Sequence, residues 1–134
     1  MKLYRVAALV LASSFLFVGA LFLAAPDGVL SFFNRLSGLW GLPEVPLAGR
    51  PFFLVLASGY MYLVSLLAWL MFKHPENRIF PLILVHGKSA TALLSLAFFL
   101  AHRPFLIYLV NFLVDGLIAA GVWWISRTWR PGNR

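Results

Sequence analysis

The chain has 134 residues, of which 62% are hydrophobic and 11% are charged, and its mean hydropathy is +0.90. A small soluble domain carries about 25% charged residues, so this composition excludes a soluble globule, and its apolar content also excludes a disordered chain. The net charge of +7 arises from 11 Lys and Arg against 4 Asp and Glu. All of these cations except Lys88 lie in short segments between apolar runs, and they form no basic stripe, which excludes a nucleic-acid partner. We therefore predict an all-α integral membrane protein.

Four apolar stretches are each long enough to cross the membrane as a helix, which takes about 20 residues for a hydrocarbon core of about 30 Å. They are residues 6–25, 52–72, 79–101 and 105–125. Proline lies at or near the first turn of the last three, where its missing N–H costs little. A cleaved signal peptide is the alternative for the first stretch, but its apolar run is long and Leu23 or Phe22 stands where cleavage needs a small residue. We expect one domain, an antiparallel bundle of four transmembrane helices.

The connection between the first and second spans contains a predicted short helix at residues 27–40. Asp27 is a candidate N-cap, and the apolar side chains recur at helical spacing on one side: Val29, Phe32, Phe33, Leu36 and Trp40. This pattern is typical of a helix lying in the membrane interface. It serves either as a connector at the membrane surface or as a lid or docking surface over the bundle. Residues 41–49 are predicted to be an irregular link.

The distribution of Lys and Arg predicts the orientation, because cytoplasmic loops carry the excess of these residues. One side of the predicted bundle has seven (Lys2, Arg5, Lys73, Arg78, Arg127, Arg130 and Arg134), and the other has three (Arg35, Arg50 and Arg103). Both termini are therefore expected in the cytoplasm, with the turn at 102–104 outside. A bacterial inner membrane is the expected location. The tryptophans, including Trp129, lie near the predicted interfaces.

Two charged residues lie inside predicted spans. Lys88 and Asp115 fall near the middle of the third and fourth spans, where an unpaired charge costs at least about 2.5 to 3.5 kcal/mol. Because these spans are antiparallel and joined by a short turn, the two residues are at matching depth. We expect a buried Lys88–Asp115 ion pair.

Other polar residues share the faces of these two charges, since helical positions three and four apart lie on one side. The predicted buried polar cluster, which is also the candidate ligand pocket, consists of Tyr62, Ser65, Lys88, Ser95, Asn111 and Asp115. Three interpretations remain open. The cluster fixes helix pairing and register, or it binds the head group of a quinone, a lipid or a small anion, or it forms part of a proton or ion pathway.

His86 is a candidate haem ligand, since imidazole commonly binds haem iron. It points about 160° away from the polar face of the third span, and no second histidine lies at matching depth. The chain has no cysteine and only four acidic residues, which disfavours a metal site, and no nucleophile or phosphate-loop motif is present. We predict no catalytic role and no cofactor, apart from quinone or lipid as a ligand.

The order of these parts resembles the small four-span membrane proteins grouped as DoxX-like. The shared features are Gly59 and Tyr60 in the second span, Gly87 and Lys88 in the third, and a central Asp115 in the fourth. Some members of that grouping look like membrane subunits of quinone-reducing oxidoreductases. The absence of cysteine fits an accessory role better than a redox role.

The prediction for function is a non-catalytic subunit or accessory factor of a larger membrane complex. Its partners would be membrane lipids and other integral subunits or a second copy, because small residues such as Gly116 and Gly121 permit close helix contact. The alternative is a membrane protein that binds a quinone or lipid head group at Tyr62, Lys88 and Asp115. A second alternative is a small transporter or proton pathway.

Overall fold

The structure is a computed structural model that describes residues 2–46, 51–101 and 103–128, with side chains described from residue 57 onward in the second of these ranges. All regular structure in these ranges is helical, which confirms the all-α prediction. The helices are α1 (Lys2–Ala24), α2 (Pro26–Leu39), α3 (Pro51–Lys73), α4 (Ile79–Ala101) and α5 (Leu106–Thr128). The predictions for Arg50, His102, Trp129, Arg130 and Arg134, and for part of the 41–49 link, concern residues outside the described ranges.

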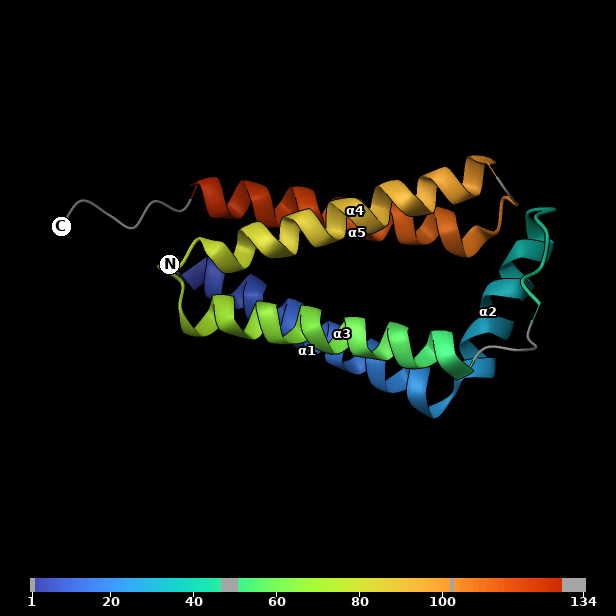
Figure 1. The fold of residues 1–134 in the computed structure, drawn as a ribbon, viewed down its shortest axis with the longest axis horizontal. Coiled ribbons are helices and arrows are strands. Elements are labelled where there is room, and N and C mark those ends of the chain that lie inside the picture. The colour runs from blue at the N-terminus through green and yellow to red at the C-terminus, as the bar shows by residue number, and fades with distance from the viewer. Residues whose placement is uncertain (1, 47–50, 102, 129–134) are drawn as a thin grey trace.

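Four helices of 23 residues each run alongside one another, and the shorter α2 crosses one end of them (Figure 1). The N-terminus, the α3–α4 turn and the end of α5 share the opposite end. Among the described residues, α1, α4 and α5 are long and apolar enough to cross a membrane. The structure therefore supports an all-α membrane protein with several spanning helices.

The outer surface of the long helices is apolar. Large exposed hydrophobic side chains include Phe17 on α1, Leu63 on α3, Leu100 on α4 and Leu117 on α5. A soluble protein rarely exposes contiguous apolar surface of this extent, whereas hydrocarbon chains of lipid solvate it well. This surface is consistent with integration in a membrane.

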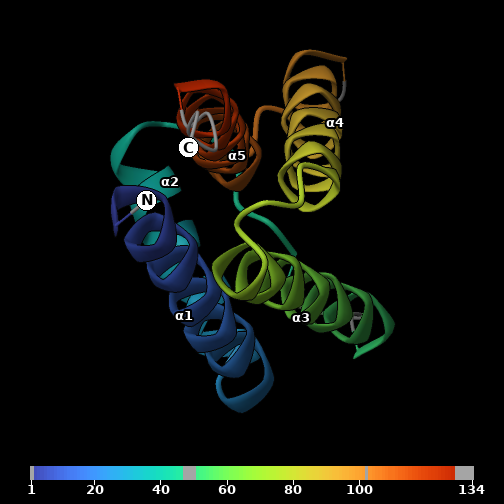
Figure 2. The same ribbon diagram turned by 90° about the vertical axis from the view of Figure 1, so that its left-hand side faces the viewer.

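The long helices form two pairs, α1 with α3 and α4 with α5 (Figure 2). Contacts within each pair are more extensive than contacts between the two pairs. Helices α1 and α3 carry small buried residues, among them Ala8 and Ala12 on α1 and Ala68 on α3. The two helices approach closely at Gly19, where a Cβ atom would lie 3.1 Å from Met61 Cβ. Only glycine fits there without displacing Met61.

Helix α2 differs in detail from its prediction. It begins one residue earlier than expected, with Pro26 in its first turn, so Asp27 is a first-turn residue and not the N-cap. Proline is favoured there because its φ already matches the helix. The predicted apolar face is also divided: Val29 and Phe33 line a cavity, whereas Phe32 and Trp40 are exposed.

The buried residues of α2 include Asn34, which makes a polar contact that the apolar pattern does not reveal. Asn34 is buried, and its side chain donates to the carbonyl of Val45 and accepts from the N–H of Val45, both at 2.9 Å. These two bonds hold the chain after α2 against the helix. They satisfy the backbone groups of a buried loop residue, which would otherwise be costly to bury.

Candidate functional site

The centre of the site is the contact between Lys88 on α4 and Asp115 on α5. Lys88 Nζ donates to Asp115 Oδ1 at 2.7 Å, and the two side chains are 1% and 4% exposed. Thr91, one turn after Lys88, donates to the other carboxylate oxygen, Asp115 Oδ2. Each charge therefore has a partner, which a buried ion pair requires.

The first helix pair contributes two aromatic rings to the same site. Lys88 Nζ lies 4.1 Å from the ring centroid of Phe15 on α1 and 4.9 Å from that of Tyr60 on α3. Both distances fall within the range of cation–π attraction. All four long helices thus meet at Lys88, whose ammonium group is enclosed by one carboxylate and two rings.

A second polar contact joins α4 and α5 one turn closer to α2. Asn111 Nδ2 donates to Ser95 Oγ at 2.7 Å. Since Ser95 follows Thr91 by four residues and Asn111 precedes Asp115 by four, these side chains lie on the same faces as the ion pair. Together they form a polar seam, defined here as Lys88, Thr91, Ser95, Asn111 and Asp115.

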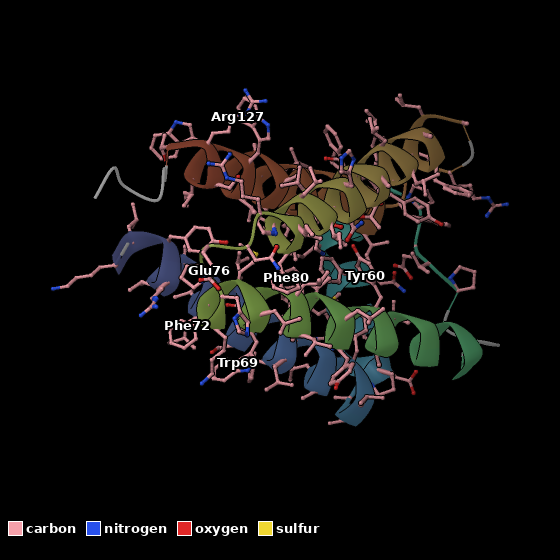
Figure 3. The ribbon with its side chains drawn as sticks, turned by 60° about the vertical axis from the view of Figure 1, so that its left-hand side comes forward. Tyr60, Trp69, Phe72, Glu76, Phe80 and Arg127 are labelled. Carbon is pink, nitrogen blue, oxygen red and sulfur yellow. The ribbon has the colours of Figure 1, made fainter. Side chains whose placement is uncertain are left out.

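The prediction that Tyr62 belongs to this cluster is wrong. Tyr62 is 61% exposed, and Tyr60 contacts Lys88 instead; Tyr60 lies between the two helix pairs in Figure 3. Positions two apart differ by about 200° on a helix, so these tyrosines face opposite sides. Ser65 is buried but donates to the carbonyl of Met61 at 2.9 Å, which satisfies its hydroxyl within its own helix.

His86 lies on the exposed side of α4, away from the polar seam. Over the part of the chain that the structure describes, no three His, Asp or Glu side chains come together as metal ligands. The site therefore consists of one ion pair with hydroxyl, amide and aromatic neighbours.

A cavity of about 780 Å³ adjoins the polar seam and lies between α1 and α5. Its polar wall includes Thr91, Ser95, Asn111 and Asp115, and the rest is mainly apolar, with these side chains among its lining: Leu11, Phe15, Val18, Phe22, Tyr60, Met61, Val110 and Ile118. Val29 and Phe33 of α2 line it as well, so α2 covers the end that it crosses. Leu21 and Val114 line the cavity and are exposed, so the cavity reaches the outer surface between α1 and α5.

A smaller cavity of about 240 Å³ continues along the same helices toward the N-terminal end of α1. It is lined by apolar side chains with Tyr4 and Gly121, and it shares Leu11 and Ile118 with the larger cavity. The two cavities therefore form one groove along the α1–α5 boundary, which is called the α1–α5 groove below.

Sequence reasoning did not find this groove. Apart from Ser14, its α1 and α2 walls consist of Leu, Val and Phe side chains, and such residues look the same in a sequence whether they line a cavity, a packed core or a lipid-facing surface. The only sequence signal was the polar seam at its edge.

Comparison with family models, with curated proteins and with solved structures finds no match for the chain. The resemblance to the DoxX-like grouping stays a prediction, as does a role as a subunit of a larger complex. The function therefore has to be inferred from the geometry of the site.

Proposed function

We propose that this chain is a four-span membrane protein that binds a lipid-soluble amphipathic molecule in the α1–α5 groove. The observation that carries the proposal is the cavity of about 780 Å³, which has one polar wall and is mainly apolar elsewhere. Sites for small molecules in proteins commonly measure about 300 to 1,000 Å³, with a mostly apolar lining and a few converging polar groups. An amphipathic molecule would match both kinds of wall.

The proposal takes α3 as a fourth span and α2 as a helix at the outer interface. Helix α3 is 23 residues long, as are the other three long helices, and it lies alongside them. At 1.5 Å per residue this length is about 35 Å, sufficient for a hydrocarbon core of about 30 Å. The lateral position of α2, across one end of these helices, suits an interfacial helix.

Aromatic and basic residues at the N-terminal end of the molecule support an orientation with that end in the cytoplasm. Lys73 Nζ lies 5.1 Å from the ring of Trp69, and Arg127 Cζ lies 4.6 Å from the ring of Trp123; Trp69 and Arg127 are labelled in Figure 3. Tryptophan rings with adjacent cations are typical of a membrane interface. Reporter fusions at both termini should therefore give cytoplasmic signals, and opposite locations would overturn the four-span topology.

The groove favours ligand binding over the two other interpretations of the polar seam. A clasp that only sets helix register needs no adjoining cavity. A proton pathway needs a group that changes charge during transport, but Lys88 and Thr91 both donate to Asp115. Binding uses the cavity and leaves the ion pair intact.

The test is to identify what travels with the purified protein. After gentle detergent purification, extraction and mass spectrometry should show one amphipathic species enriched in near-stoichiometric amount. Val114→Trp, at a residue lining the cavity, should lower the amount about tenfold or more. Leu113→Trp is the matched control, because Leu113 is exposed, points about 100° away from Val114 on the same helix and lines neither cavity; it should leave the amount unchanged. Equal, nonspecific lipid profiles for both variants and the original chain would contradict the proposal.

A further inference from the structure

We propose that the ligand has an uncharged head group with a hydrogen-bond-accepting oxygen, that Asn111 and Ser95 hold this oxygen, and that its hydrocarbon tail lies in the α1–α5 groove. This inference rests on the proposed function and specifies its ligand class.

The charge balance of the site disfavours a charged head group. Lys88 does not line the cavity, because Phe15 and Tyr60 lie over its ammonium group and Asp115 accepts from it. The ion pair has no net charge to offer. An anionic head would have to displace Asp115 from Lys88, and a cationic head would compete with Lys88 for Asp115. Either change leaves an unpaired charge in an apolar interior, which is strongly unfavourable.

The unused donors of the polar seam determine what the head group must provide. An asparagine side chain carries two N–H donors, and Asn111 gives one of them to Ser95. No residue in the described ranges accepts the second N–H of Asn111 or the hydroxyl hydrogen of Ser95. Either orientation of the amide leaves at least one N–H for a ligand. A carbonyl or hydroxyl oxygen in the cavity would accept it.

The shape of the groove determines the tail. The groove follows α5 from Ile107 to Ile125. These two residues are 18 positions apart, which corresponds to about 27 Å along the helix at 1.5 Å per residue. A lipid chain in one leaflet occupies about 15 Å, half of the hydrocarbon core. The groove therefore accommodates a long apolar chain with the head near Asn111 and the tail passing Leu11 and Ile118.

The first experiment compares lipids with the same tails and different heads. Native mass spectrometry of the full chain, stripped of bound lipid in detergent, measures competition between dioleoylglycerol and dioleoylphosphatidic acid. Decylubiquinone, with ring carbonyls in place of ester and hydroxyl oxygens, forms a third arm. We expect at least one of the two uncharged ligands to bind at least about tenfold more tightly than phosphatidic acid. A preference for phosphatidic acid would overturn the inference.

The second experiment tests the donors. Asn111→Leu should weaken binding of the preferred uncharged ligand about three- to tenfold, the value of one neutral hydrogen bond. Ser95→Ala should weaken it by a similar factor and serves if Asn111→Leu folds poorly. Tyr62→Phe, on the exposed side of α3, is the control and should bind as the original chain does.

The outcomes separate this inference from the proposed function. If Val114→Trp abolishes binding while Asn111→Leu and Ser95→Ala both bind normally, the groove is the site but its head-group donors are wrongly assigned. If no ligand binds, or if Val114→Trp binds as well as Leu113→Trp, the proposed function itself fails.

Discussion

The two helix pairs of this molecule are held together by different forces. Helices α1 and α3 carry small buried residues and approach closely at Gly19, which lies against Met61. Helices α4 and α5 meet through buried polar groups, namely the Lys88–Asp115 ion pair and the Asn111–Ser95 hydrogen bond. In a membrane, where apolar contact with lipid competes equally with apolar contact between helices, close packing and polar bonds are the two main means of association.

The difference shows why the groove lies where it does. The members of each pair contact each other along their length, whereas α1 and α5 face each other across the cavities that form the α1–α5 groove. The cation–π contacts of Lys88 with Phe15 and Tyr60 join the pairs at one depth. The space beside this junction stays open to a ligand.

Breaking the ion pair should have the largest effect. Lys88→Met leaves the Asp115 carboxylate buried without its cation, and we expect a loss of about 3 to 5 kcal/mol in the free energy of unfolding. The double variant Lys88→Met/Asp115→Leu removes both charges and should recover most of this loss. The measurement is an SDS titration in mixed micelles followed by circular dichroism. A double variant as unstable as the single one would contradict the pairing of charges as the source of stability.

Disturbing the close approach of α1 and α3 should have an intermediate effect. Gly19→Leu forces a side chain against Met61, and overpacking of this kind costs about 1 to 3 kcal/mol. Gly59→Leu is the matched control, because a Cβ there meets no atom within 4 Å and the residue is exposed. The same titration should separate the two variants. Equal stability would show that α1 and α3 are not packed closely at Gly19.

Removing the hydroxyl that supports Asp115 should have the smallest effect of the three. Thr91→Val keeps the branched shape and loses the bond to the carboxylate, and such bonds in membrane proteins average about 0.6 kcal/mol, with a maximum of about 1.7 kcal/mol. Thr128→Val is the control, since Thr128 is exposed and its hydroxyl bonds only to the carbonyls of its own helix. A loss for Thr91→Val no larger than that for Thr128→Val would remove Thr91 from the polar seam.

The helices and the depth of the charged pair could be predicted from the sequence, because both follow from strong constraints. Long apolar runs need a hydrogen-bonded backbone in lipid, and a lysine within such a run needs a partner at its own depth. These constraints led to Lys88 and Asp115, which the structure places in contact.

The details that depend on helix rotation could not be predicted. Tyr60 and Tyr62 carry the same side chain, so the sequence does not distinguish which of them contacts Lys88. The orientation of α3 about its own axis decides this, and it places Tyr60 beside Lys88. In α2 the buried residues are Leu30, Asn34 and Ser37, whereas the more apolar Phe32 and Trp40 are exposed. The groove depends on where two helix pairs do not touch, a property of three-dimensional packing that no residue pattern encodes locally.

The most direct test of the groove as a binding site is to find where a bound tail lies. A dioleoylglycerol analogue with a photoreactive group in one acyl chain should, after irradiation and peptide mass spectrometry, label groove residues such as Leu11, Val18 and Ile118, and excess unlabelled dioleoylglycerol should suppress this labelling. Labelling spread evenly over outward-facing residues such as Leu93 and Leu100, without suppression by competitor, would contradict a binding site between α1 and α5.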